Sequence, residues 1–150
     1  MSVTMEQVLA VLNPEEPDSG KARALGPDAL PFLQQLVHGT NQMLASKATS
    51  AAGAIDGPGA VGVLEQAAHS PVAAVRVNAA AAVTHLAAPL GAAVLIHLLS
   101  DPDPGVRRRA LRSSAGRPDP ALRARIHQIS ISDHDARLRT EAAEILKKHP

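Results

Sequence analysis

The chain has no cysteine, no tryptophan and no tyrosine, and Phe32 is its single phenylalanine. Without cysteine, its 150 residues form no disulfide, no thiolate metal site and no cysteine nucleophile. Large aromatic side chains usually contribute much of a globular core, so the core here must be built from alanine, valine and leucine. Small aliphatic side chains suit helices that approach closely, and we therefore expect stacked helices instead of a β-sandwich or barrel.

Long hydrophobic runs are also absent. No stretch reaches the roughly 18 consecutive apolar residues of a membrane-spanning helix, because Arg76, Asn78, His85 and Pro89 interrupt the longest apolar region. Residues 1–10 lack the basic segment and long apolar run of a secretory signal. We expect a soluble, cytoplasmic protein without membrane contact, and its richness in Ala, Arg, Pro and Gly suggests a bacterial source.

Charge is distributed unevenly along the chain. Residues 1–75 carry three basic and seven acidic groups, whereas residues 76–150 carry twelve basic and seven acidic groups. Such asymmetry can indicate an acidic or polyanionic partner. It can also reflect only which helix faces meet water.

Three segments share one pattern: residues 70–79, 101–110 and 133–142. Each has a polar or proline-rich turn, an aliphatic residue, an arginine, two variable positions and an alanine. The arginines are Arg76, Arg107 and Arg139, so the spacing is 31 and then 32 residues. Residues 39–48 form a weaker copy with Ala45 in place of the arginine. A repeat of this period predicts a helical solenoid.

Each copy follows a second amphipathic run, and glycine or proline separates the units. The runs are 29–38, 60–69, 92–99 and 120–129, with breaks at Gly26-Pro27, Gly57-Pro58, Ala88-Pro89 and Gly116–Pro118. The pattern predicts one domain with an N-terminal helical cap over residues 1–26 and four helix pairs over 27–56, 57–88, 89–117 and 118–150. Helices over 5–12 and 20–25 are expected in the cap. Either Asp101 or Asp103 can cap the helix that follows them, and Asp133 and Asp135 repeat this arrangement.

The segment DPDPGVRRRALRSSAG, residues 101–116, resembles bacterial HEAT repeats of the kind related to phycobilisome-lyase subunits. The second helix of such repeats opens with an Asp/Pro turn followed by V-R-x-x-A. The resemblance extends over residues 27–150 and implies an all-α fold, a right-handed α-α superhelix. It also implies that Arg76, Arg107 and Arg139 join neighbouring repeats, with Asp103 and Asp135 as the matching acids. Val72 takes the acid's place in the middle copy, so Arg76 requires the acid of another turn.

The second helices of such arrays line a concave surface. The residues expected to project from it and to bind a partner are Lys47, Asn78, His85, Arg108, Arg109, Arg112, Glu141 and Glu144. The repeat spacing predicts Arg109–Glu141 and Arg112–Glu144 pairs, which would leave Arg108 the least neutralised of the basic cluster. A solenoid with this surface is typical of a non-enzymatic protein-interaction scaffold, here for a partner with a partly acidic surface.

Two other functions stay open. The cluster Arg107–Arg112 allows binding of nucleic acid through phosphate contacts, although the chain lacks the aromatic residues on which single-stranded bases stack. The family resemblance alone suggests an accessory subunit of a phycobilin-lyase-like chaperone. The last helix, with Leu138, Ile145 and Leu146, has no following repeat to cover it, so pairing with a second copy is a further expectation.

No catalytic, metal or cofactor site is expected. The seven histidines lie seven or more residues apart, so no two share a helix face at the spacing of metal ligands. The chain contains neither a Gly-x-Ser-x-Gly nucleophile motif nor a phosphate-binding Gly-x-x-x-x-Gly-Lys loop. The sequence therefore favours a binding protein without a cofactor over an enzyme.

Overall fold

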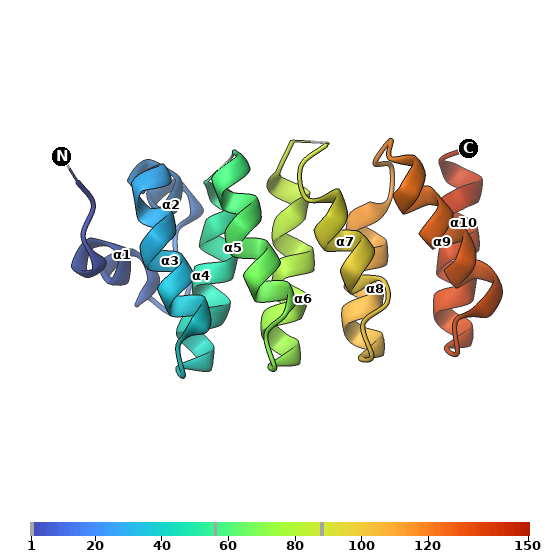
Figure 1. The fold of residues 1–150 in the computed structure, drawn as a ribbon, viewed down its shortest axis with the longest axis horizontal. Helices are drawn as coiled ribbons and strands as arrows, with labels where there is room; N and C mark the ends of the chain where they lie inside the picture. The colour runs from blue at the N-terminus through green and yellow to red at the C-terminus, as the bar shows by residue number, and fades with distance from the viewer. Residues whose placement is uncertain (1, 56, 88) are drawn as a thin grey trace.

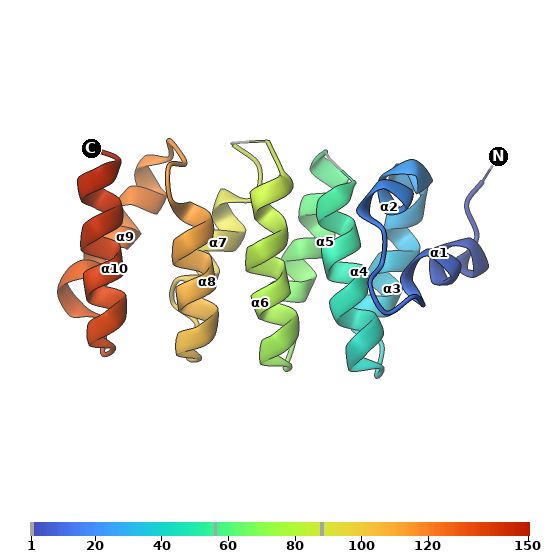
Figure 2. The same cartoon turned by 180° about the vertical axis from the view of Figure 1, so that it is seen from behind.

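The computed structural model describes residues 2–55, 57–87 and 89–150, which form ten α-helices, two short 3-10 helices and no strand. From α3 onward, the helices alternate between two layers along one axis (Figures 1 and 2). One layer holds the first helices of the pairs, and the second helices form the face turned to the viewer in Figure 2. The all-α solenoid predicted from the repeat is confirmed.

The cap consists of α1 (Met5–Leu12) and α2 (Ser19–Leu25), close to the helices predicted there. The first helices are α3 (Leu30–His38), α5 (Pro58–Ala68), α7 (Ala92–Leu98) and α9 (Pro120–Ser132), and Pro27–Ala29 form a 3-10 turn before α3. The second helices are α4 (Gln42–Ala54), α6 (Ala73–Ala82), α8 (Pro104–Ser114) and α10 (Ala136–Lys148), and Val83–His85 continue α6 as a 3-10 turn. Ala88, named above with Pro89 as a break between pairs, lies outside the described residues.

Aspartate side chains start several of the helices. The carboxylates of Asp18, Asp103, Asp119 and Asp135 each accept hydrogen bonds from backbone N–H groups in the first turn of α2, α8, α9 and α10. These N–H groups have no partner within the helix, so an acceptor at the N-cap stabilises the helix start. Proline stands in the first turn of α8 and α9, where its missing N–H costs no helical bond.

The core consists of small and branched side chains packed between the two layers. Ala48, Ala79, Ala110 and Ala142 occupy the same position in the four second helices and are all fully buried. Leu138 is also buried, at 2% exposure. The expectation that it would be left uncovered at the end of the array was wrong, because α9 packs closely against α10.

The pairs are not packed equally tightly. α4 packs closely against α6, and α6 against α8, whereas α8 and α10 make few close approaches over the described residues. Gly53 in α4 lies so near α6 that a Cβ atom added to it would stand 2.8 Å from Cβ of Ala82 and 2.9 Å from its carbonyl oxygen. The absence of a side chain at Gly53 thus permits the close approach of α4 to α6.

Candidate functional site

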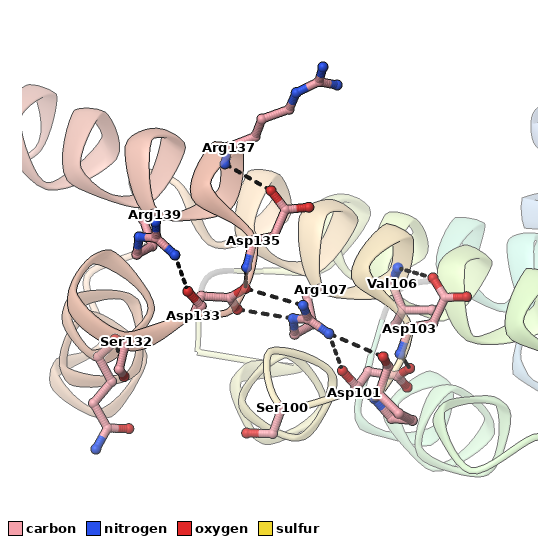
Figure 3. Close-up of polar contacts among 12 residues, drawn as sticks. Ser100, Asp101, Asp103, Val106, Arg107, Ser132, Asp133, Asp135, Arg137 and Arg139 are labelled. Carbon is pink, nitrogen blue, oxygen red and sulfur yellow. Dashed lines mark hydrogen bonds and ion pairs between the residues drawn. The ribbon is translucent and has the colours of Figure 1, made fainter.

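Arginine and aspartate side chains form a chain of contacts along the edge where the first helix of each pair turns into the second (Figure 3). Arg107 donates to both carboxylate oxygens of Asp133 in the next pair, with Nε–Oδ2 at 3.0 Å and Nη2–Oδ1 at 3.1 Å. Its third nitrogen, Nη1, donates to the carbonyl oxygen of Asp101, in the turn before its own helix, at 3.0 Å. Arg107 thus joins the third pair to the fourth. We call these contacts the arginine relay.

Arg76 makes the same set of contacts one pair earlier. It donates to Asp101 at 2.8 Å from Nε and 3.2 Å from Nη2, and to the carbonyl oxygen of Ser70 at 2.8 Å. Both aspartate side chains are buried, at 3% exposure for Asp101 and 6% for Asp133. Bidentate bonds between a planar guanidinium and a carboxylate are strong and fix the orientation of both groups. The relay therefore sets the position of the second pair relative to the third, and of the third relative to the fourth.

The acids assigned to the relay from the sequence were wrong. Asp103 and Asp135 cap α8 and α10, and the relay acids are Asp101 and Asp133, two residues earlier. The backbone N–H of each capping aspartate also donates to the relay acid, at 2.9 Å in both turns. Each Asp-x-Asp turn thus divides two tasks between its aspartates: the first binds the arginine and the second starts the helix.

The electrostatics of the relay are clearest at Asp133. Burial alone would raise its pKa, but hydrogen bonds from Arg107 and from the backbone of Asp135, together with the charge of Arg107, outweigh this effect. The pKa of Asp133 is therefore held below its ordinary value. The carboxylate is ionised at neutral pH and pairs with Arg107 as a charged group.

Arg117 joins neighbouring pairs at another turn. Its Nη2 donates to the carbonyl oxygens of Val83 at 2.6 Å and Leu86 at 3.3 Å, which follow α6. Burial lowers the pKa of Arg117 from its ordinary value. Because its hydrogen bonds here go to backbone carbonyls, this arginine connects the turns after α6 and α8.

The basic cluster of α8 is paired differently from the prediction. Arg108 and Arg112 both reach Oε1 of Glu141 in α10, at 3.3 Å, and Arg109 does not. Arg108 is therefore not the least neutralised member, and the predicted Arg109–Glu141 and Arg112–Glu144 pairs were wrong. The repeat arithmetic predicted correctly that arginines of α8 pair with α10, but not which of them reach Glu141.

Two adjoining hollows lie on the second-helix face, beside α2, and share Ser19 and Ser50. We call them together the α2–α6 groove. Its lining comes from α2 and the turn before it (Pro17, Asp18, Ser19, Ala22, Arg23), from α4 (Ser46, Lys47, Ser50, Ala51, Ala54), from α6 and its 3-10 extension (Asn78, Ala81, Ala82, His85), and from α8 (Arg109). Many of the lining side chains contributed by α4 and α6 are small.

The groove carries more positive than negative charge. Arg23 donates to the carbonyl oxygen of Ala54 at 3.4 Å, and Lys47 to that of Pro14 at 2.8 Å, so both bind backbone and not carboxylates. The Nε atom of Arg109 is buried without a hydrogen-bond partner within the described residues. Among the described residues that line the groove, Asp18 is the one acid, and its carboxylate caps α2. The groove thus offers cations that no acidic side chain of the described chain neutralises.

The residues predicted to bind a partner fall into two places. Lys47, Asn78, His85 and Arg109 line the α2–α6 groove, whereas Arg108, Arg112 and Glu141 lie between α8 and α10. Glu144 is exposed and makes no ion pair within the described part of the chain. Sequence reasoning missed Ser19 and Arg23, because the repeat pattern contains no information on how the cap packs against α4.

The two-layered stack of helix pairs, joined by arginines, defines the class of this protein as a helical-repeat solenoid. The sequence of residues 92–149, which spans α7 to α10, matches the family model described as HEAT repeats. The last two helix pairs are therefore similar to HEAT repeats. The chain has no match among the curated proteins with which it was compared. None of the described helices is both long and apolar enough to cross a membrane.

Proposed function

We propose that this chain is a non-enzymatic protein-interaction scaffold, and that the α2–α6 groove takes an acidic segment of a partner protein. Solenoids of helical repeats commonly bind partners along the extended surface that their stacked helices form. The cations that line the groove carry the proposal: Arg23, Lys47 and Arg109 form no ion pair within the described residues. The proposal places the binding surface at the junction of cap and repeats.

The form of the groove supports an extended segment as its occupant. Its lining includes several alanine and serine side chains, among them Ala54, Ala81 and Ser50. These short side chains would allow the backbone of a bound segment to approach the helices closely. Residues of α2, α4, α6 and α8 together line these two hollows, and a single extended segment of polypeptide suits such a space better than a folded domain.

The charges of the groove support an acidic segment. Arg23 and Arg109 line the same hollow, together with His85. A carboxylate placed there would accept charge-assisted hydrogen bonds, which are stronger than bonds between neutral groups. Two arginines in one hollow can also bind one carboxylate from both sides or two neighbouring acidic side chains.

The arrangement of the α8 arginines gives nucleic-acid binding less support. Arg107 is engaged by Asp133, and Arg108 and Arg112 by Glu141. A phosphate would compete with these carboxylates for the arginines, and any loss of pairing would offset part of the gain. We therefore propose a protein partner, and the experiment below includes a DNA duplex as the alternative ligand.

Fluorescence polarisation with two labelled peptides tests the proposal. One is a flexible peptide of alternating glutamate and serine, and the other has glutamine at every glutamate. We expect tighter binding of the glutamate peptide, and about tenfold weaker binding by Arg109→Gln, since hydrogen bonds to charged groups contribute about 1.5–3 kcal/mol. Arg23→Gln should weaken binding in the same direction.

The matched control is Arg137→Gln, because Arg137 is exposed on α10 and does not line the groove. This variant should bind the glutamate peptide like the unmodified chain. Equal affinity for the two peptides would refute the acidic specificity. A labelled DNA duplex bound more tightly than the glutamate peptide, with steep loss of affinity in salt, would favour the nucleic-acid function instead.

A further inference from the structure

One position of the first helices is buried in every pair except the last. Val37, Ala68 and Leu99 each lie two residues before the relay position in the turn and are exposed by only 7%, 1% and 2%. Ile131 has the same position before Asp133 and is 66% exposed. The second helices repeat the contrast: Thr49, Ala80 and Leu111 are fully buried, whereas the equivalent Ala143 is exposed. The outer side of α9 and α10 is thus an apolar surface of the kind that a following pair covers elsewhere.

The relay is also incomplete at this end. Arg139 donates from Nη1 to the carbonyl oxygen of Asp133 at 2.6 Å, the bond that Arg76 and Arg107 make to their own turns. The Nε and Nη2 groups, which bind an aspartate of the next pair in both earlier arginines, meet no carboxylate among the described residues. Arg139 is thus held by the same backbone bond as the two earlier arginines (Figure 3), but no acid of the described residues pairs with it.

We infer that Ile131, Arg139 and Ala143 form a docking surface for a helix pair of a partner protein, whose second helix is preceded by an aspartate two residues before its N-cap. The chemistry of this occupant follows from the two complete steps of the relay. In both, an aspartate at that position receives the backbone N–H of the N-cap residue and the Nε and Nη2 groups of the arginine. The proposal concerns the end of the solenoid and is independent of the α2–α6 groove.

The joint between the first two repeat pairs supports this reading of the relay. Ala45 stands there in place of the arginine, and Ser70 in place of the aspartate of the following turn. Where the arginine is missing, the acid is missing too. An arginine retained at position 139, and held in the orientation of the other two, therefore indicates an acid from a following unit.

An added helix pair tests the docking surface directly. Residues 117–150 are placed a second time directly after Lys148, which keeps the 32-residue register and supplies a copy of Asp133 at the expected place. Because the chain has no cysteine, Ile131→Cys introduces a single thiol whose labelling rate reports whether this position is covered. We expect labelling to be at least about tenfold slower in the extended chain than in the unextended one.

The role of Arg139 is tested in the same extended chain. Arg139→Gln and the exchange of the added aspartate for asparagine should each restore several-fold faster labelling, and the double variant should add little to either. Arg137→Gln, two residues earlier on the same helix, is the matched control and should change nothing. Unchanged labelling on addition of the pair, or no effect of Arg139→Gln, would overturn the inference.

The identity of the occupant is tested with the unextended chain. Sedimentation over a wide range of concentration should show a monomer, with the thiol at position 131 labelled at one constant rate. A dimer whose formation protects that thiol would overturn the proposed partner and identify the occupant as a second copy of this chain.

Discussion

The joint between α4 and α6 and the joint between α8 and α10 connect successive pairs of the same solenoid by different means. α4 and α6 are in close contact, and Gly53 has no room for even a Cβ atom next to Ala82. α8 and α10 make few close approaches and are connected by arginine side chains, to Asp133 and to Glu141. The first joint is apolar and tight, and the second is polar and wider.

The difference follows from the side chains that face the joint. Helices with alanine and glycine at the interface can approach to the short end of the usual range of about 8–10 Å between axes, whereas longer side chains hold them apart. Burial of apolar surface then stabilises the first joint, and one side-chain hydrogen bond crosses it, from Asn78 Nδ2 to the carbonyl oxygen of Ser46 at 3.5 Å. The joint between α8 and α10 is instead stabilised by the ion pair of Arg107 with Asp133, so its stability should depend on the charges of these two residues.

The largest effect is expected for Asp133→Ala. The variant leaves Arg107 partly buried, at 14% exposure, without its acid, and breaking such a pair costs about 3–5 kcal/mol. Urea unfolding followed by circular dichroism should show this loss, mainly as early unfolding of α9 and α10. Asp119→Ala is the control, since it removes only the N-cap of α9 and should cost about 1 kcal/mol. Equal losses for the two variants would contradict a special role of the relay.

The tight joint should respond to a single methyl group. Gly53→Ala places Cβ against Ala82, and we expect a loss of about 1–3 kcal/mol from overpacking. Gly62→Ala makes the same change in α5, where nothing lies within 4 Å of the added atom. It should stabilise the chain by about 0.5–1 kcal/mol, the difference in helix propensity. Thermal unfolding of both variants checks the prediction, and a Gly53→Ala chain as stable as Gly62→Ala would disprove the tight fit.

Acid should loosen the fourth pair before the others. The pKa of Asp133 is lower in the folded chain than its ordinary value, so its ionisation stabilises the fold above the ordinary aspartate pKa of about 3.9. This contribution is lost as the pH falls below that value and through the folded pKa. Hydrogen exchange of α10 should therefore accelerate in this range, and Asp133→Asn should remove much of the pH dependence. An unchanged profile in Asp133→Asn would assign it to other carboxylates.

The smallest effect is expected for Glu141→Gln. Arg108 and Arg112, which pair with Glu141, are about half exposed, at 49% and 54%, and such surface pairs contribute about 0–1 kcal/mol. The loss should decrease further in high salt because of screening. Glu144→Gln, on the exposed side of the same helix, should be neutral. A loss from Glu141→Gln as large as that from Asp133→Ala would show that the relay is not the principal tie.

The sequence was sufficient for the fold and for the register of the repeats, because the arginine spacing and the aliphatic positions depend only on local period. It did not identify the relay acids. Asp101-Pro-Asp103 and Asp133-His-Asp135 each offer two aspartates near the helix start, and either can serve as the N-cap. The joint that contains Ala45 does not separate the two positions, because Ser70 and Val72 replace both aspartates in its turn.

Only part of the α2–α6 groove could be predicted from the sequence. Lys47, Asn78, His85 and Arg109 project from the second helices, as their place in the repeat indicates, and they line the groove. Other lining residues come from α2, and the packing of α2 on α4 depends on tertiary contacts that no repeat pattern contains. The pairing of Arg108 with Glu141 could not be predicted either, since it depends on the side-chain conformations between α8 and α10 and not on the repeat spacing.

Hydrogen exchange of Asp133→Asn, resolved along the chain, tests most directly whether the two joints are stabilised differently. The neutral side chain keeps the shape of aspartate but removes the charge that binds Arg107. We predict faster exchange in α9 and α10, with protection of α4 and α6 unchanged, as expected for a solenoid whose units contact only their neighbours. An equal loss of protection in α4, α6 and α10 would contradict the account, because it would mean that the relay stabilises the whole solenoid and not one joint.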